Sequence, residues 1–407
     1  MKIALIIRRL NVKGGAQRQI LELARELKKR GHDVTLYTFL LSKEHCYADL
    51  MQDIDIAVLP DFNPPPEKRE GVMRLFSYVR TVQYENNASK KLALIIDDDT
   101  DLLHPHDHVS YRVAAFFKKY KKNISSVWMM NDMPTRAWSF WRESQFRPEL
   151  RLSLAKKIFY WLVDTYDALR FIALQDAIVV VDDRDRVWVK ESFHKDASIV
   201  RCGLHIEHFR YRERSITKGQ PLRILGIGIL LVHRRFEDSI EAVRILRKEG
   251  YDGMLSIIGS RESDRKYAAS LAEQVEKSGM NRYVAFQGDV TEDELMDSYN
   301  RHDVFVFPNH LQSWGLAVFE AMASGLPVIV SKSAGASEVL TDKKNALLVN
   351  PKSPREIAKA VQSLVDNPDL YRTLSKNGRD FVEQNISWGK YTDQMEEIFK
   401  KTMNKER

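Results

Sequence analysis

The chain alternates short apolar runs with amphipathic, helix-like segments, and this alternation starts again near residue 222. Residues 3–7, 127–130 and 178–181 are apolar runs of the first series, and residues 222–227 and 304–307 belong to the second. Short runs that end in glycine or polar residues are typical of buried strands in a parallel sheet. Strands that alternate with helices predict a doubly wound α/β domain. Two such series predict two Rossmann-like domains that face a cleft, where we expect a ligand to bind.

The length of 407 residues agrees with two domains, because a domain usually contains about 100–200 residues. Residues 210–221 are rich in charge and end near Gly219 and Pro221, which is typical of a connecting segment. We therefore expect an N-terminal domain over residues 1–215 and a C-terminal domain over residues 216–385.

The net charge of +7 lies wholly within residues 1–215, and residues 216–407 are balanced. A basic excess admits nucleic acid, anionic membranes and phosphorylated ligands as partners. No RNP, helix-turn-helix or zinc-finger pattern is present, which argues against a nucleic-acid-binding protein. Cys46 and Cys202 are too few for a disulfide framework and fit a reducing cytoplasm. No run approaches the ~20 apolar residues of a membrane span.

A membrane surface remains a candidate partner. Residues 116–122 interleave aromatic residues with lysines inside the basic half of the chain. Such a segment can contact anionic lipid at the inner face of the cell membrane. An amphipathic surface helix explains the same pattern equally well.

Two segments are candidates for binding phosphate groups. Gly14 and Gly15 follow the first strand and open a helix, where free N–H groups favour an anion; a plain structural turn is the alternative. Arg234 and Arg235 stand between a strand that ends at Gly228 and the next helix, and guanidinium groups pair with phosphate oxygens in a two-pronged manner. A solvated charge run is the alternative for the arginines.

The segment over residues 308–330 is the most informative one. A strand leads into a loop, and Trp314, Gly315 and Leu316 open a helix that carries Glu320. Backbone N–H groups at this helix start are suited to a diphosphate, and a carboxylate further along can accept hydrogen bonds from ribose hydroxyls.

Polar residues also follow two strands of the first series. His106 lies among three histidines at the end of a strand, and it is a candidate contact to a substrate hydroxyl. Zinc binding is the less favoured alternative, since neither helical spacing nor cysteine ligands accompany these histidines. Asn131 and Asp132 follow the next strand and are further candidates for contacts to a ligand. The acidic run over residues 97–101 resembles an acidic metal-binding motif, but a solvated connection explains it better.

Several ordered motifs make the chain similar to glycosyltransferase family 4, which has the two-domain GT-B fold. These motifs are "GGAQRQILELARELKKRGHDVTLYT", "DLLHPHD", "VRCGLHIEHF" and "FVFPNHLQSWGLAVFEAMASGLPVIVS". The last motif matches the signature region of the family. Residues 386–407 resemble the family's terminal helix, which returns to the N-terminal domain.

The resemblance implies roles for individual residues. Gly14 and Gly15 match the glycines that approach the donor phosphates, and His106 matches the histidine near the transferred sugar. Arg234 stands at the phosphate-binding lysine, with Arg235 beside it. Glu320 matches the second glutamate of the E-x7-E motif, which binds the ribose.

The sequence departs from the family pattern at two positions. Gln312 replaces the first glutamate of E-x7-E, and Ile229 replaces the arginine that usually follows Gly228. Glutamine keeps hydrogen-bonding capacity but cannot act as a base. We still count Gln312 with His106 and Arg234 among the candidate catalytic residues, because the family's usual front-face scheme needs no attacking carboxylate.

The resemblance implies a retaining glycosyltransferase of the hexosyl or deoxyhexosyl type. It would use a nucleoside-diphosphate sugar and a glycan or lipid-linked acceptor in cell-surface polysaccharide or glycoconjugate synthesis. Asn131 and Asp132 would line the acceptor side. It implies no metal ion and no required cofactor, since protein groups stabilise the leaving diphosphate. A catalytically weak subunit that binds nucleotide sugars is the alternative, and Gln312 and Ile229 motivate it. A nucleic-acid-binding protein is a further, less favoured alternative.

Overall fold

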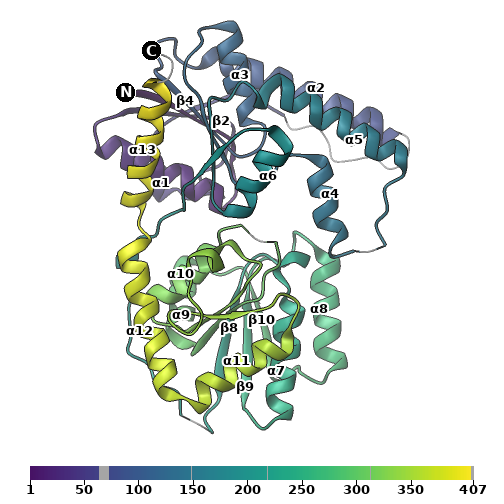
Figure 1. The fold of residues 1–407 in the computed structure, drawn as a ribbon, viewed down its shortest axis with the longest axis vertical. Coiled ribbons are helices and arrows are strands. Elements are labelled where there is room, and N and C mark those ends of the chain that lie inside the picture. Colours follow the sequence, from purple (N-terminus) through teal and green to yellow (C-terminus); the bar gives the residue numbers. More distant parts are fainter. Residues whose placement is uncertain (64–72, 148, 218, 312, 405–407) are drawn as a thin grey trace. The chain divides into compact units, whose positions relative to one another are not determined.

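The computed structural model of the chain consists of two compact units, each an α/β domain built on one parallel sheet. Unit 1 comprises Met1–Arg201 and Trp388–Arg407, and unit 2 comprises Cys202–Ser387. The structure describes residues 1–63, 73–147, 149–217, 219–311 and 313–404. The helices of each unit surround its sheet (Figure 1). Two α/β domains, each with a parallel sheet, confirm the predicted fold class.

Unit 1 contains a seven-stranded sheet of order β3-β2-β1-β4-β5-β6-β7. Its strands are β1 (Lys2–Leu10), β2 (Asp33–Leu41), β3 (Asp55–Val58), β4 (Leu102–His106), β5 (Val127–Met130), β6 (Ala177–Val180) and β7 (Ala197–Ile199). Its helices are α1 (Gly15–Lys29), α2 (Met73–Ile95), α3 (Ser110–Tyr120), α4 (Arg136–Ser144), α5 (Leu154–Asp167), α6 (Asp183–Phe193) and α13 (Trp388–Asn404). The direction of the strand order reverses between β1 and β4, where parallel sheets usually bind ligands.

Unit 2 contains a six-stranded sheet of order β10-β9-β8-β11-β12-β13. Its strands are β8 (Leu222–Ile227), β9 (Gly253–Ile258), β10 (Val284–Gly288), β11 (Val304–Phe307), β12 (Val328–Ser331) and β13 (Leu347–Val349). Its helices are α7 (Phe236–Lys248), α8 (Arg265–Lys277), α9 (Glu292–Arg301), α10 (Leu316–Ala323), α11 (Pro354–Asp366) and α12 (Pro368–Asn385). The order reverses here between β8 and β11.

The strand sequences explain these buried sheets. All four residues of β11 and all four of β12 are buried, as expected for strands covered on both faces. Helix starts follow local signals: Thr291 and Glu294 form a capping box at α9, and Asp182 accepts a hydrogen bond from the Asp185 N–H at the start of α6. Each unit therefore folds around a sheet whose strand ends carry the polar loops.

Helix α13 completes unit 1, although it is distant from the rest of that unit in sequence. Its buried residues include Met395 and Phe399, and the Phe399 ring lies 5.0 Å from the ring of His104 in β4. Arg30, which follows α1, forms an ion pair of 2.9 Å with Glu396. His32 contacts the same carboxylate at 2.5 Å. The terminal helix thus packs on α1 and contributes to the core of unit 1.

The connecting segment differs in detail from the sequence-based boundary near residue 215. Residues 202–215 group with unit 2 by their contacts. Arg214 explains this grouping, because its guanidinium donates to the carbonyl oxygens of Tyr299 at 2.9 Å and Ser324 at 3.2 Å. A charged residue that reads as solvated in sequence is here partly buried against α9 and α10.

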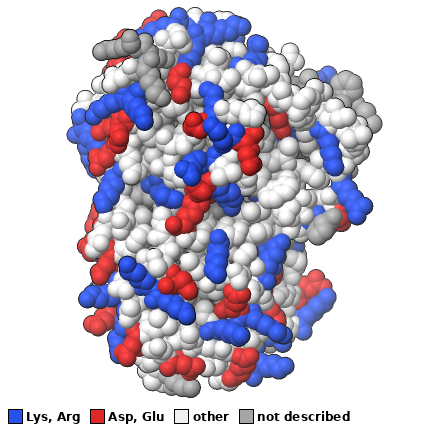
Figure 2. All heavy atoms as spheres, in the orientation of Figure 1, with Lys and Arg blue, Asp and Glu red and all other residues white. Residues whose placement is uncertain are grey.

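Charged residues of both signs are mixed on the visible surface of the molecule. On the face drawn in Figure 2, lysine and arginine side chains are interspersed with aspartate and glutamate over both units. Within the described residues, no helix is both long enough and apolar enough to cross a membrane.

Candidate functional site

The loops that follow β8, β11 and β12 meet at the point in unit 2 where the strand order reverses. The His310 N–H, after β11, donates to the carbonyl oxygen of His233, after β8, at 2.8 Å. Ser333, after β12, accepts a hydrogen bond from the Leu311 N–H at 3.0 Å. The hydroxyl of Ser333 also lies 2.8 Å from Nδ1 of His310. Three neighbouring strand ends therefore form one connected set of loops.

Arg234 projects into this set of loops without an acidic partner among the described residues. Its guanidinium packs over Gly228, where a Cβ atom would lie 3.2 Å from the guanidinium carbon. In the amide orientation that satisfies both groups, Arg234 Nη1 donates to the Asn309 side-chain oxygen at 2.9 Å, and the amide nitrogen donates to the Arg234 carbonyl at 3.2 Å. Burial lowers the pKa of Arg234 to about 10, so the guanidinium stays charged at neutral pH. The site holds a partly desolvated cation that can pair with an anion.

Asn309 is a site residue that the sequence analysis missed. It is 1% exposed and holds the guanidinium of Arg234 through a neutral group. A carboxylate in the same place would neutralise the arginine. The position directly after the buried run of β11 was the available signal, because strand ends of parallel sheets collect ligand-binding residues.

Arg235 differs from its neighbour, since acidic residues of α7 already pair with it. Its guanidinium donates to both carboxylate oxygens of Asp238, at 2.9 and 2.8 Å. It also forms an ion pair of 2.7 Å with Glu237. These carboxylates raise the pKa of Arg235 against the opposing effect of burial. The expected role of Arg235 as a second free cation for a diphosphate is therefore not supported by these contacts.

The start of α10 ends the same loop after β11 that carries Asn309. Gly315 precedes the helix with φ 86°, and a Cβ atom there would lie 2.8 Å from the Phe307 ring. Trp314 is 3% exposed and stacks on Phe319 of α10, with ring centroids 4.5 Å apart. Leu316 is the first residue of the helix. The first N–H groups of a helix lack partners within it, so this end suits an anion.

Glu320 lies one turn into α10 and is 7% exposed. Its Oε2 accepts a hydrogen bond of 2.6 Å from the buried hydroxyl of Tyr299 in α9. The contact orients the carboxylate, and Tyr299 is a second supporting residue that the sequence analysis missed. No local sequence signal connects Tyr299 with Glu320, because the two residues come from different helices. Gln312, the other half of the motif, lies outside the described residues.

The glycines of unit 1 lie where they were expected. Gly14 is the N-cap of α1, and Gly15 is its first residue. A Cβ atom at Gly14 would lie 2.5 Å from the side-chain oxygen of Gln17, whereas one at Gly15 would meet nothing within 4 Å. No side-chain hydrogen bond is formed at the N-cap of this helix, so the helix start stays suited to an anion.

His106 lies inside the core of unit 1. The residue is 0% exposed, and neither of its ring nitrogens has a hydrogen-bond partner in the described part of the chain. Its ring lies 4.3 Å from the ring of His104, whose Nδ1 is 2.5 Å from the Val127 carbonyl oxygen. Burial lowers the pKa of both histidines, that of His104 to about 4, so both rings are neutral near pH 7. A buried ring contacts no ligand in this arrangement, and His108 is the partly exposed histidine of the cluster.

The two residues after β5 are also engaged within unit 1. Asp132 accepts hydrogen bonds from the Met133 N–H at 2.9 Å and the Trp138 indole at 3.2 Å, and it pairs with Arg142 at 2.7 Å. These contacts hold α4 against the end of β5. The amide nitrogen of Asn131 is buried and has no partner among the described residues. Asp132 therefore stabilises the position of α4, whereas the Asn131 amide can still donate a hydrogen bond to a ligand.

The acidic run over residues 97–101 contacts the first strand, which agrees with a connection between elements. Lys2 forms ion pairs with Asp97 at 3.0 Å and Asp99 at 2.7 Å, so the acidic run stabilises the first strand. The described residues contain no cluster of histidine, cysteine and carboxylate side chains that could hold a metal ion.

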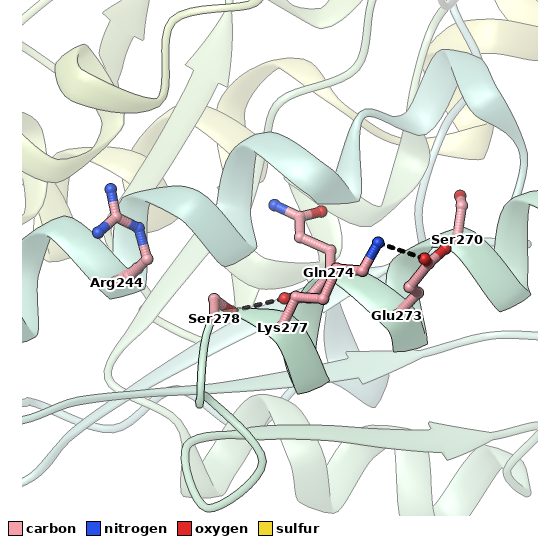
Figure 3. Close-up of a pocket in the computed structure, with 6 residues that line it drawn as sticks. All are labelled: Arg244, Ser270, Glu273, Gln274, Lys277 and Ser278. Carbon is pink, nitrogen blue, oxygen red and sulfur yellow. Dashed lines mark hydrogen bonds and ion pairs between the residues drawn. The ribbon is translucent and has the colours of Figure 1, made fainter.

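A hollow on the surface of unit 2 lies between α7 and α8. Its polar groups pair with neighbours, as Lys277 does with Glu273 at 2.5 Å. Because these groups satisfy one another, the hollow offers little for a ligand. It is lined by Arg244, Ser270, Glu273, Gln274, Lys277 and Ser278 (Figure 3).

Two protein families match adjoining parts of the chain. The family described as Glycosyltransferase Family 4 matches residues 13–208, and the one described as Glycosyl transferases group 1 matches residues 208–381. The chain belongs to glycosyltransferase family 4. The loops that carry Arg234, Gly315 and Glu320 lie within the second match, and Gly14, Gly15 and His106 lie within the first.

Curated relatives of this family 4 protein carry several names. Mannosylfructose-phosphate synthase of Agrobacterium fabrum is 22% identical over 402 residues, which is 92% of this chain and 84% of that protein. A capsular polysaccharide biosynthesis glycosyltransferase of Staphylococcus aureus is 22% identical over 61% of this chain and 68% of that protein. An uncharacterised glycosyltransferase of Methanocaldococcus jannaschii is 24% identical over 63% of this chain, and the chain spans 66% of that relative's length.

Solved structures show that the fold is GT-B. Anabaena HepE in complex with UDP superposes with a TM-score of 0.71 at 15% identity, covering 98% of this chain and 100% of that one. Sucrose-phosphate synthase from Thermosynechococcus elongatus superposes with a TM-score of 0.73 at 19% identity. The superposition covers 98% of this chain and 99% of that one. Identities this low establish the fold and leave the substrates open.

Proposed function

We propose that the chain is a retaining glycosyltransferase that moves a sugar from a nucleoside-diphosphate sugar to a glycan or lipid-linked acceptor. The observation that carries the proposal is the uncompensated guanidinium of Arg234 among the loops that also contain the start of α10. The solved relative HepE binds UDP and UDP-glucose according to its structures. A relative named for capsular polysaccharide biosynthesis supports a role in cell-surface polysaccharide or glycoconjugate synthesis. The proposal includes that this synthesis takes place in the cytoplasm, at the inner face of the membrane.

The proposed chemistry depends on stabilising the leaving diphosphate. Negative charge grows on the phosphate oxygens as the bond to the sugar breaks, and a fixed cation in a partly dry site stabilises that charge. Arg234 supplies the cation, and the N–H groups at the start of α10 supply further donors. Glu320, oriented by Tyr299, accepts from the ribose hydroxyls. These groups bind the donor without a metal ion or cofactor.

Retention follows when the acceptor attacks from the face that the diphosphate leaves. The acceptor hydroxyl forms the new bond to the sugar carbon, the bond to the diphosphate breaks, and the departing phosphate oxygen takes the hydroxyl proton. No side chain has to act as nucleophile or base in this step. The presence of glutamine at residue 312 is compatible with it.

A second candidate function is a subunit that binds nucleotide sugars without transferring them. The observation that favours it is Gln312, an uncharged residue at a motif position that the family fills with glutamate. The two functions share donor binding and differ only in turnover.

The deciding experiment is a thermal-shift screen with UDP-, GDP-, ADP- and dTDP-sugars, followed by a transfer assay with a cell-envelope acceptor extract. We expect one donor class to stabilise the protein and to be consumed, with the anomeric configuration retained in the product by NMR. Added EDTA should leave the rate unchanged. Arg244→Ala is a suitable control variant, because Arg244 pairs with Glu241 outside the candidate site.

Each possible outcome of this experiment has a clear meaning. Binding without turnover supports the subunit. Binding of no donor overturns both functions, and an inverted anomer overturns retention.

A further inference from the structure

Helix α5 of unit 1 carries its apolar residues on the outside. Leu154 is 73% exposed and Trp161 is 63% exposed, and no residue of the helix is buried. Residues 154, 158, 161 and 162 follow helical spacing, so they share one face. Leu169, in the π-helical turn that continues α5, is 72% exposed. The α5 apolar face consists of Leu154, Ile158, Trp161, Leu162 and Leu169.

The acidic residues of α5 point inward, which reverses the usual pattern of a surface helix. Asp164 accepts hydrogen bonds from the N–H groups of Arg136 at 2.9 Å and Ala137 at 3.0 Å, at the start of α4. Asp167 accepts from Arg112 at 2.9 Å and from the hydroxyl of Tyr111. The polar side of α5 therefore attaches the helix to unit 1, and its apolar side chains are exposed.

Basic residues flank the α5 apolar face. Arg151, Lys156 and Lys157 are exposed at its beginning, and Arg170 is exposed at its end. The only acidic residues of α5 are the two that point inward. An exposed apolar face with tryptophan, leucine and flanking cations is the composition of a helix that lies in a membrane interface.

We propose that the α5 apolar face docks unit 1 onto an anionic lipid bilayer. The leucine, isoleucine and tryptophan side chains enter the boundary between headgroups and acyl chains, and the flanking cations contact lipid phosphates. This inference does not depend on the proposed sugar transfer, since it concerns only where the protein binds.

A second copy of the chain fits this face less well. In a two-fold symmetric dimer the same patch meets itself, so the cations at each end of one patch would face a second patch that is also basic. The outward face of α5 offers no carboxylate to compensate them. A bilayer with anionic headgroups supplies the missing negative charge.

The segment over residues 116–122 is a weaker candidate for the same contact. Phe117 is 0% exposed, and Lys118 and Lys121 form ion pairs with Asp176 and Asp98. Aromatic residues that pack in the core cannot enter lipid. The interleaved pattern there is that of a surface helix, and the membrane contact belongs to α5.

The test is co-sedimentation of the full chain with phosphatidylcholine vesicles, with and without phosphatidylglycerol. We expect binding to the anionic vesicles, and a drop of about tenfold or more in Trp161→Ser/Leu162→Ser. Lys156→Gln/Lys157→Gln should lose about tenfold on anionic vesicles only. The matched control Leu94→Ser/Met254→Ser removes two other exposed apolar residues, which are 48% and 41% exposed, and should bind like the parent chain.

A second measurement reports insertion directly. Brominated lipids quench tryptophan at the depth of the acyl chains, so they should quench the parent chain and not Trp161→Phe. Unchanged sedimentation of Trp161→Ser/Leu162→Ser would overturn the proposal. A parent dimer that this variant dissociates in light scattering would also overturn it, in favour of self-association. Nucleotide-sugar thermal shifts of the same variants check the fold and test the proposed function separately.

Discussion

The candidate residues of unit 2 and those of unit 1 were identified from similar patterns, yet the structure uses them differently. In unit 2, Arg234 keeps its charge available because a neutral residue, Asn309, holds it in place. In unit 1, the carboxylate of Asp132 already pairs with Arg142 of α4, and His106 lies in the core. The comparison teaches that a polar residue at a strand end is ready for a ligand only when its neighbours leave its charge uncompensated.

The largest effect is expected from the uncompensated cation. Arg234→Ala should lower the rate of sugar transfer by about 100- to 1000-fold, the usual cost of removing one group that stabilises transition-state charge. The transfer assay with saturating donor measures it.

Arg235→Ala is the neighbouring control. It should leave the rate within a few-fold and instead lower the melting temperature, because Asp238 loses its partner. Equal losses of transfer rate in both variants would contradict the conclusion that only Arg234 is available to the diphosphate.

The next effect concerns the start of α10. Gly315→Ala should destabilise the chain by about 2–3 kcal/mol, because φ 86° strains an alanine and its Cβ would lie 2.8 Å from Phe307. Gly279→Ala is the matched control, since Gly279 has φ 68° and nothing within 4 Å of a Cβ. Gly279→Ala should lower the free energy of unfolding by about 1 kcal/mol, through backbone strain alone. Denaturant unfolding of both variants separates crowding from strain.

A pH dependence is expected from the core of unit 1. The folded-state pKa of His104 is lowered from 6.5 to about 4, so the unfolded chain binds more protons between these values. His104 should leave the free energy of unfolding unchanged above pH 6.5. As the pH drops to 5, this free energy should fall by about 2 kcal/mol, because only the unfolded chain takes up the proton. Denaturant unfolding across this range measures the slope, which should be smaller in His104→Asn. An unchanged slope in that variant would show that other groups cause the pH dependence.

The smallest effect is expected at the strand end of unit 1. Asp132→Asn removes the charge that pairs with Arg142 and should cost about 1 kcal/mol of stability. Donor-induced thermal shifts should stay as in the parent chain. A lost donor shift in a variant that is still folded would place Asp132 in the binding machinery and weaken the contrast between the units.

Much of the fold could be predicted from the sequence. The apolar runs at residues 222–227 and 304–307 are strands β8 and β11, and the helix expected after Trp314 is α10. Helix α13 was expected from resemblance rather than from local pattern. The grouping of residues 202–215 with unit 2 had no sequence signal, because Arg214 reads as solvated although carbonyl oxygens of α9 surround it.

The candidate site was predictable only in part. The positions of Arg234, Gly315 and Glu320 followed from motif order along the chain. The sequence could not show that Arg235 is paired and Arg234 is not, because both arginines precede the same acidic helix. It could not show that α5 exposes its apolar residues either, since an apolar stripe on a helix ordinarily faces the core.

The sequence by itself determined the alternation of strands and helices, the two α/β domains and the family, because hydropathy periods and turn residues are local properties. Only the tertiary structure decided which charges are free, which histidines are buried and which face of α5 meets solvent. Those properties depend on residues distant in sequence, such as Asn309 for Arg234 and Arg112 for Asp167. Desolvation and charge compensation are set by such neighbours, and a linear pattern does not contain them.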